Sequence, residues 1–233
     1  MIFVGIDDTD SPDSRGTNQL ARKIVAALAP DWPCRRIVRH QLLEDPRVPC
    51  TSRNGSASIV LSEHPHRAAE DVVLICREVM LGDFVDGSDP GLCFATRVPA
   101  DIELFGRRCK ECLVTAEEAR DLAWKHGLYL EGLGGTEDGI IGALAAVGLA
   151  AGGNDGRVVQ WSDWPDDLSG MQPVSLISDR DVEIRDFETA RSVTSGTVDI
   201  GKRLRPNMND GHAVLFVRPD PGRSNHYRAL KLP

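Results

Sequence analysis

The sequence predicts an α+β fold with a ferredoxin-like β-α-β-β-α-β pattern in its N-terminal half. Apolar runs of strand length alternate with segments of helical periodicity up to about residue 98. A glycine-rich loop plus a helix of small residues follows between residues 132 and 151, and from residue 156 short apolar runs are separated by polar loops. We therefore expect two regions, 1–155 and 156–233, of which the second is rich in strands.

The first strand and helix follow from the pattern of apolar residues. Residues 2–6 (IFVGI) form a continuous apolar run, which is typical of a strand buried on both faces. In the next segment, the apolar positions 20, 21, 24, 25 and 28 recur at helical spacing. Thr17 is expected to cap this helix at its N-terminus and Pro30 to end it.

The same criteria place the remaining elements. We expect strands at 34–43, 56–61 and 91–98 and a helix at 66–81, which together complete the β-α-β-β-α-β pattern. Thr115 and Glu118 predict a capping box at the start of a helix over 115–127, and Gly127 a C-cap. In the last region the runs GRVVQW, VSLI, VEIR and AVLFV predict strands.

Composition restricts the possible functions. The chain has 233 residues, a formal net charge of −8 and an aromatic content of 5%. An acidic chain binds nucleic acid poorly through general electrostatics, and few aromatic rings are present to stack on bases. No apolar stretch is long enough to span a bilayer, and the N-terminus lacks the basic start of a signal peptide. We therefore expect a cytoplasmic protein with no membrane partner and with its six cysteines reduced.

Three carboxylates follow the first strand in the motif GIDDTDS. Asp7, Asp8 and Asp10 repel one another, so a sequence that keeps them together needs a compensating cation or a catalytic use for them. They follow the carboxyl end of a strand, where open α/β layers bind ligands. Mg²⁺ held by one or two carboxylates and by substrate phosphates fits this pattern. A polar surface turn is the alternative.

Two glycine-containing segments are predicted to bind phosphate. Gly16 and Thr17 open the first helix close to the acidic motif, and a helix N-terminus offers N–H groups to an anion. In the later glycine-rich loop the predicted phosphate-binding residues are Gly134, Gly135, Thr136 and Gly139. Residues without a Cβ let backbone N–H groups approach a ligand. Close packing against a neighbouring helix explains the small residues that follow equally well.

Arg53 and Asn54, in the stretch DPRVPCTSRNGSAS, are further candidate ligand-binding residues. An arginine beside a tight turn can hold a phosphate or a carboxylate through two hydrogen bonds. Asn-Gly is also the usual two-residue hairpin turn, and the sequence does not decide between the two interpretations.

The C-terminal stretch is basic although the chain as a whole is acidic. It contains two acidic residues, Asp210 and Asp220, and seven basic ones: Lys202, Arg203, Arg205, Arg218, Arg223, Arg228 and Lys231. Such a segment can face an anionic ligand or the acidic N-terminal half, and we interpret it as a solvated face.

Three stretches, in this order, resemble archaeal tRNA-isoleucine 2-agmatinylcytidine synthetase and its shorter bacterial relatives. They are GIDDTDS followed by Gly-Thr and Leu-Ala, then VPCTSRNGSASIVL, then GIIGALAAVGL. The resemblance covers roughly residues 1–150 and implies an atypical kinase-like domain beside a ferredoxin-like domain. It implies that ATP and Mg²⁺ phosphorylate the C2 carbonyl oxygen of a cytidine, after which agmatine displaces the phosphate. Asp7, Asp8 and Asp10 would then serve metal binding and catalysis, and Thr17 would be autophosphorylated.

The sequence departs from that family after about residue 160, because the OB-fold and zinc ribbon that grip tRNA are not found in it. This difference and the acidic charge argue against tRNA as a partner and favour an unknown small-molecule or nucleobase acceptor. We therefore expect an Mg²⁺- and ATP-dependent phosphotransferase or ligase that activates an acceptor oxygen by phosphorylation. Two alternatives stay open: a phosphohydrolase that uses one of the opening aspartates as its nucleophile, and a non-catalytic nucleotide-binding module.

Overall fold

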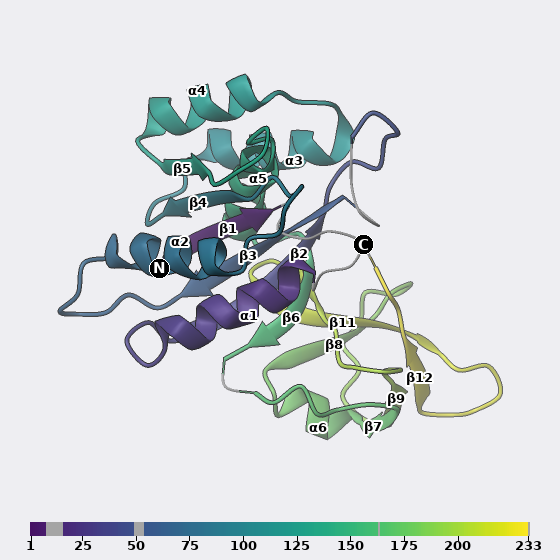
Figure 1. Cartoon of the computed structure of the whole chain (residues 1–233). Coiled ribbons are helices and arrows are strands. Elements are labelled where there is room, and N and C mark those ends of the chain that lie inside the picture. Colours follow the sequence, from purple (N-terminus) through teal and green to yellow (C-terminus); the bar gives the residue numbers. More distant parts are fainter. Residues whose placement is uncertain (8–15, 49–53, 163, 233) are drawn as a thin grey trace.

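The computed structural model describes residues 1–7, 16–48, 54–162 and 164–232, which form six helices and one mixed sheet of twelve strands (Figure 1). The strand order is β5-β4-β1-β3-β2-β6-β10-β11-β12-β9-β7, and β8 pairs with β11. The predicted α+β class is thereby confirmed. No helix within these ranges is long and apolar enough to cross a bilayer. The cytoplasmic location stays a prediction.

The N-terminal half contains the predicted β-α-β-β-α-β order. Its elements are β1 (Ile2–Asp7), α1 (Thr17–Leu28), β2 (Cys34–Gln41), β3 (Gly55–Leu61), α2 (Asp71–Gly82) and β4 (Gly91–Ala95). β3 lies between β1 and β2, β1 lies between β3 and β4, and all three pairings are antiparallel. Each βαβ unit thus encloses a strand of the other, which confirms the predicted arrangement.

Helices cover both faces of this part of the sheet (Figure 1). Ile2, Val4 and Ile6 of β1 are completely buried in an apolar cluster with α1 and α2. Phe3 belongs to a second cluster, on the other face, with α3 (Ala100–Glu111) and α5 (Gly139–Gly152). A strand buried on both faces needs apolar side chains at successive positions, which explains the continuous apolar run of β1.

Helix α5 is buried along most of its length. Eleven of its fourteen residues are buried, and it packs between the sheet and helices α3 and α4 (Ala116–His126). A Cβ on Gly148 would come within 2.1 Å of the carbonyl oxygen of Ile102 in α3. Close packing against a neighbouring helix, one of the two explanations that the sequence left open, therefore accounts for the C-terminal end of α5.

The last part of the chain continues the same sheet through β6 (Arg157–Trp161), which pairs with β2. The further elements are β7 (Met171–Pro173), α6 (Val174–Ser178), β8 (Val182–Asp186), β9 (Thr197–Asp199), β10 (Asn207–Asn209), β11 (His212–Pro219) and β12 (His226–Ala229). They enclose a third apolar cluster, drawn from residues between Leu168 and Val217. The division into regions 1–155 and 156–233 stays a prediction.

Helices α6 and α3 differ from the prediction, and the short strands β5, β7, β9, β10 and β12 were not predicted either. The run VSLI forms helix α6 rather than a strand, with Pro173 before its first turn and with Val174 and Ile177 buried on one side. A four-residue apolar run does not distinguish a helix from a strand by periodicity alone. Helix α3 was not predicted, because its buried positions, Ile102 and Phe105 among them, are scattered among charged residues.

The helix ends are mostly as predicted. Thr115 and Glu118 form the capping box of α4, and Gly127 ends that helix with φ of 65°. The N-cap of α1 is Gly16 rather than Thr17, since the carbonyl of Gly16 already accepts the N–H of Gln19. Helix α2 begins at residue 71, five residues later than predicted.

Candidate functional site

Several predicted site residues lie at one edge of the sheet, formed by strand ends, where β1 and β5 end and β3 and β4 begin. β1 ends there at Asp7, which pairs with Gly91 at the start of β4. Gly91 in turn pairs with Gly132, the last residue of β5 (Tyr129–Gly132). β3 begins at the same edge with Gly55, directly after Asn54. The antiparallel pairing therefore brings Asp7, Asn54 and the glycine-rich loop after β5 together.

The carboxylate of Asp7 lies against the first turn of α5. A Cβ on Gly142 would come within 1.7 Å of Oδ2 of Asp7, so the missing side chain makes room for this carboxylate. β1 presents Asp7 on the α5 face, since Gly5, two residues earlier, already packs against the backbone of Ala143. Gly142 thus makes room for the Asp7 side chain at the end of β1, whereas Gly148 allows α5 to pack closely against α3. Asp8 and Asp10 lie outside the described residues.

Helix α1 starts at this edge and runs away from it, because it ends at Leu28 shortly before β2 starts at the opposite edge. Gly16 caps the helix without a side-chain hydrogen bond, and the first N–H groups of a helix carry positive potential that favours anions. Thr17 is buried, with 8% of its surface exposed. Phosphorylation of its hydroxyl group stays a prediction and would require the helix start to open.

The glycine-rich loop is held by a carboxylate that the sequence analysis did not single out. Asp89 accepts hydrogen bonds from the backbone N–H and from the hydroxyl group of Thr136, both at 2.6 Å. Gly135 has φ of +61°, and a Cβ there would come within 1.4 Å of Oδ1 of Asp89. The carboxylate of Asp89 therefore already accepts the hydrogen bond of the Thr136 N–H group, which was predicted to bind phosphate. If Thr136 is to bind ATP, Asp89 has to move.

The start of α5 is set by backbone packing. A Cβ on Gly139 would come within 2.0 Å of the carbonyl oxygen of Asp89, and one on Gly91 within 2.1 Å of the carbonyl oxygen of Gly139. These contacts leave no room for side chains and place the helix N-terminus beside the start of β4. The glycines at 91 and 139 are thus required by close approach of two backbones, whether or not a phosphate binds there.

Asn54 and Arg39 also lie at this edge of the sheet. The side-chain amide of Asn54 donates to the carbonyl of Leu43 at 2.8 Å, so its nitrogen already supports the loop. Arg53 lies outside the described residues. Arg39 of β2 supplies a guanidinium group near this edge, where it packs beside Gly55 and donates to Gln41 at 3.1 Å. The sequence analysis missed it because a single arginine in an amphipathic strand resembles a solvated residue.

Mg²⁺ fits the chemistry of the acidic motif, since carboxylate and phosphate oxygens are the donors that it takes in proteins. Within the described ranges no group of three or more His, Cys, Asp and Glu side chains is placed to hold a metal ion. Asp7 is the member of the motif that these ranges include. A metal ion at this edge would therefore need further ligands from ATP, from water, or from residues outside the described ranges.

A second polar cluster has the geometry of a catalytic triad but not its accessibility. His40 donates through Nδ1 to Asp155 at 2.8 Å and contacts the hydroxyl group of Ser58 through Nε2 at 2.8 Å. Lys110 of α3 also pairs with Asp155. Burial opposes the charge of Asp155, but hydrogen bonds from His40 and Lys110 outweigh it and lower the pKa of this carboxyl group. Ser58 and His40 have no exposed surface, so we assign the cluster to the core.

Comparison with known proteins identifies related sequences and structures. No profile of a known protein family matches the chain. The chain is 29% identical to tRNA(Ile2) 2-agmatinylcytidine synthetase TiaS of Pyrococcus horikoshii over 158 residues, which are 64% of this chain and 35% of the relative. A crystal structure of TiaS with tRNA(Ile2) and ATP matches with 26% identity and a TM-score of 0.56, over 63% of this chain and 36% of that one. The structure of a tRNA fluorescent labeling enzyme matches with 24% identity and a TM-score of 0.55, over 63% and 35% of the two chains.

The solved relatives contradict the argument against tRNA as a partner. The acidic charge argued against tRNA as a partner, but a solved relative binds tRNA(Ile2) together with ATP. The prediction was wrong because net charge averages over a whole chain and does not describe a local basic surface. The chain spans about a third of the length of these relatives. Over about two-thirds of its own length, this chain resembles tRNA(Ile2) 2-agmatinylcytidine synthetase in sequence and in fold.

Proposed function

We propose that this chain is an Mg²⁺- and ATP-dependent enzyme that phosphorylates an acceptor oxygen on an RNA nucleobase, as the activating step of a ligase reaction. The observation that carries the proposal is the convergence of Asp7, the start of α1 and the 134–139 loop at one edge of the sheet. Gly142 supports it, because it leaves room for the Asp7 carboxylate. The similarity to TiaS, which has been solved with ATP and tRNA(Ile2), supports the choice of nucleotide and of RNA.

The residues at this edge have separate tasks in the proposed reaction. N–H groups at the start of α1 would bind phosphate oxygens, and those of the 134–139 loop would join them once Asp89 releases the N–H group of Thr136. Asp7, together with Asp8 and Asp10 of the same motif, would hold Mg²⁺, which neutralises charge on the transferred phosphoryl group. Arg53 would add positive charge near the acceptor. Catalysis of this kind depends on positioning and on electrostatic stabilisation rather than on a covalent protein intermediate.

The proposed chemistry is a phosphoryl transfer followed by a displacement. The acceptor oxygen forms a bond to the γ-phosphorus of ATP while the bond from that phosphorus to the bridging oxygen breaks, and ADP leaves. The phosphate on the nucleobase is then a leaving group that an amine displaces. Measuring whether pyrophosphate is released checks this sequence, because release of intact pyrophosphate together with AMP would contradict transfer of the γ-phosphoryl group.

Isothermal titration calorimetry with ATP tests the site. Binding should require Mg²⁺, and Asp7→Asn should weaken it at least tenfold, because a charge-assisted interaction of about 1.5–3 kcal/mol is lost. Asp121→Asn, which makes the same change on the exposed face of α4, should bind ATP like the wild type. A wild-type protein that binds no ATP with or without Mg²⁺ would contradict the proposal.

Turnover distinguishes the proposed enzyme from the two alternatives. Incubation with γ-labelled ATP and a tRNA transcript should transfer the label to the RNA, and Asp7→Asn should abolish the transfer. ATP binding without transfer to any tested RNA would favour a nucleotide-binding module. Hydrolysis of a phosphoester substrate in the absence of ATP would favour a phosphohydrolase.

A further inference from the structure

A cavity of about 310 Å³ lies between α1 and the segment that follows β6. Its walls include Arg22 of α1, Trp161 and Trp164. It is separate from the edge that carries Asp7, because β6 starts near that edge and runs to Trp161 at the opposite end, where Trp161 pairs with Arg36 of β2. The proposed ATP site therefore does not account for this cavity.

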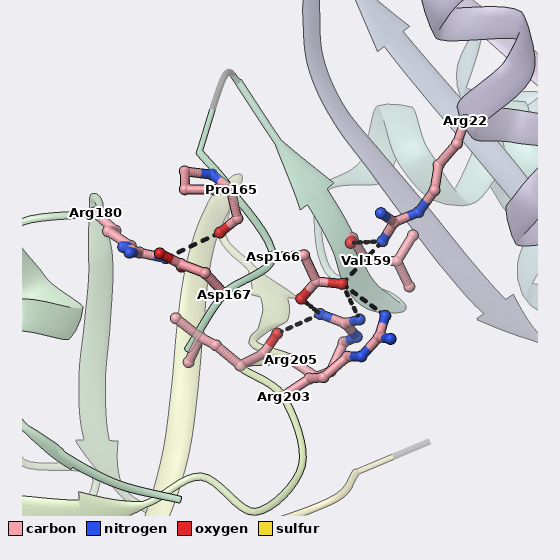
Figure 2. Close-up of polar contacts among 9 residues, drawn as sticks. Arg22, Val159, Pro165, Asp166, Asp167, Arg180, Arg203 and Arg205 are labelled. Carbon is pink, nitrogen blue, oxygen red and sulfur yellow. Dashed lines mark hydrogen bonds and ion pairs between the residues drawn. The ribbon is translucent and has the colours of Figure 1, made fainter. Parts of the chain in front are cut away.

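One carboxylate beside the cavity holds three guanidinium groups (Figure 2). Asp166 accepts from Arg203 and from Arg205 at 2.8 Å, and from Arg22 at 3.2 Å. Arg22 also donates to the carbonyl of Val159 at 2.8 Å. Three positive charges thus surround one negative charge, and they come from two distant parts of the chain. This is a local excess of positive charge on a protein whose formal net charge is −8.

Aromatic rings and a buried donor line the same cavity. Trp161 and Trp164 are two of the four tryptophans in the chain. The indole N–H of Trp161 donates to the carbonyl of Arg180 at 2.9 Å, which fixes this ring, whereas 42% of Trp164 is exposed. Arg180 is 8% exposed, and among the described residues its Nε finds no hydrogen-bond acceptor. The guanidinium group of Arg180 pairs with Asp167 at 2.7 Å and lies 5.5 Å from the centre of the Trp164 ring, so a further positive charge borders the aromatic wall of the cavity.

We propose that this cavity binds one nucleotide unit of a single-stranded RNA. Its phosphate would lie at the Asp166 cluster, which is Asp166 with Arg22, Arg203 and Arg205, and its base against Trp164. Guanidinium groups bind phosphate oxygens through paired hydrogen bonds, and bases stack on aromatic rings with little regard to sequence. The choice of RNA rests on the proposed function, in which an RNA nucleobase is the acceptor. Helix α1 connects the two sites, since its start belongs to the proposed ATP site and Arg22 lies farther along it.

A purely structural role of the cluster would explain less. Ion pairs to Asp166 do join α1 to the C-terminal part of the chain. Such a joint does not need the exposed ring of Trp164. It also does not need Arg203, whose side chain is 57% exposed and adds a third positive charge to a carboxylate that two others already neutralise.

Fluorescence anisotropy with a short labelled single-stranded RNA, in the absence of ATP and Mg²⁺, tests the proposal. Trp164→Ala should raise the Kd roughly five- to hundredfold, which is the usual effect of losing one base stack. Arg203→Ala should also weaken binding and should lower the dependence of log Kd on log salt by roughly 0.7, the value for one phosphate of a single strand. Trp124→Ala and Arg107→Ala are the matched controls, and both should bind like the wild type. Trp124 is an exposed tryptophan on α4, and the Arg107 side chain is 56% exposed and ion-paired on α3.

Equal affinity for the wild type, Trp164→Ala and Arg203→Ala, or no binding by the wild type, would overturn the proposal. Because ATP is absent, neither result affects the calorimetric test of the ATP site, so the two proposals fail separately. Crosslinking with a thiouridine-containing RNA gives a readout on the unmodified protein: adducts within residues 157–180 support the site, and adducts confined to other segments contradict it. Displacement of the RNA by a free nucleoside monophosphate of equal affinity would assign the cavity to a small nucleotide instead.

Discussion

The carboxylate of Asp7 occupies the space that Gly142 leaves by having no side chain, since a Cβ at that position would come within 1.7 Å of Oδ2. This contact joins the end of β1 to the first turn of α5, two elements that are far apart in the sequence. The position of the Asp7 carboxylate, a candidate metal ligand, therefore depends on how closely α5 packs against the sheet. The size of one residue in the core therefore controls the geometry of the proposed site.

Gly142→Ala should weaken ATP binding in the presence of Mg²⁺ while the fold is retained. The added methyl group displaces a short side chain rather than backbone, which costs about 1 kcal/mol of stability through an unfavourable rotamer. The misplaced carboxylate should lower the ATP affinity about 10- to 100-fold, the effect of losing one charge-assisted interaction. Calorimetry and thermal unfolding measure the two effects. Gly82→Ala at the end of α2, where a Cβ meets no atom within 4 Å, is the control. Unchanged ATP affinity in Gly142→Ala would show that the contact has no functional role.

Asp89→Ala should loosen the glycine-rich loop. It removes the acceptor for both the N–H and the hydroxyl group of Thr136. Each lost hydrogen bond contributes about 0.5–1.5 kcal/mol. Hydrogen exchange of the amides at 134–137 should become faster, while that of α5 stays slow. Asp86→Ala, an exposed aspartate three residues earlier, should leave exchange in the loop unchanged. If the loop amides exchange equally in both variants, other contacts hold the loop.

Asp166 should contribute stability that depends on pH. The hydrogen bond from Arg205, followed by the charges of Arg205, Arg203 and Arg22, outweighs partial burial and lowers the pKa of Asp166 to about 2. A carboxyl group with a lowered pKa stabilises the fold above its unfolded pKa of about 3.9, and this stability is lost as the pH falls from about 4 to about 2. Asp166→Asn should therefore lower the free energy of unfolding at pH 7 by about 1–2 kcal/mol, allowing for screening. Its stability should then change less between pH 4 and pH 2 than that of the wild type.

Denaturant unfolding at several pH values measures this difference. Asp101→Asn is the comparison, because Asp101 also pairs with basic groups, Lys125 and His126, but its side chain is 43% exposed. It should change the pH dependence less. Parallel curves for the wild type and Asp166→Asn would contradict the proposed contribution of the cluster to the fold.

Asp155→Ala should destabilise the fold without a direct effect on ATP binding. The substitution leaves the buried Nδ1 of His40 and the amine of Lys110 without their shared acceptor. An unsatisfied buried donor costs about 1–3 kcal/mol. Thermal unfolding should show a clearly lower midpoint for Asp155→Ala and a smaller change for Asp155→Asn, which keeps one acceptor oxygen. Ser58→Ala should leave phosphoryl transfer intact, and loss of transfer in that variant would return the cluster to the list of catalytic candidates.

The pattern of side chains was sufficient to predict most of the fold. β1 was identified because both of its faces are buried, and α4 because Thr115, Glu118 and Gly127 mark its ends. Helix α3 was missed because its apolar face is narrow and charged residues surround it. Helix α6 was mistaken for a strand because its apolar run is too short to show a period.

The candidate site could be predicted only in part. Asp7 and the 134–139 loop stand out locally, since carboxylates after a buried strand and clustered glycines are visible in the sequence. Their convergence depends on the pairing of β1 with β4 and of β4 with β5, which no local pattern specifies. Asp89 is a single acidic residue before Pro90 and was overlooked for that reason. The Asp166 cluster combines residues 22, 166, 203 and 205, which only the folded chain brings together.

The pairing of β2 with β6 has a consequence for attempts to divide the protein. A shortened chain that ends near residue 155 would lose β6, so that β2 would become an unpaired edge strand of the sheet. Such an edge presents unpaired N–H and C=O groups to other molecules and promotes self-association. Residues 1–155 produced alone are therefore expected to aggregate, even though they contain every predicted ligand of ATP. In the full chain β6 pairs with β2, so the C-terminal strands cover this edge strand of the half that carries the proposed ATP site.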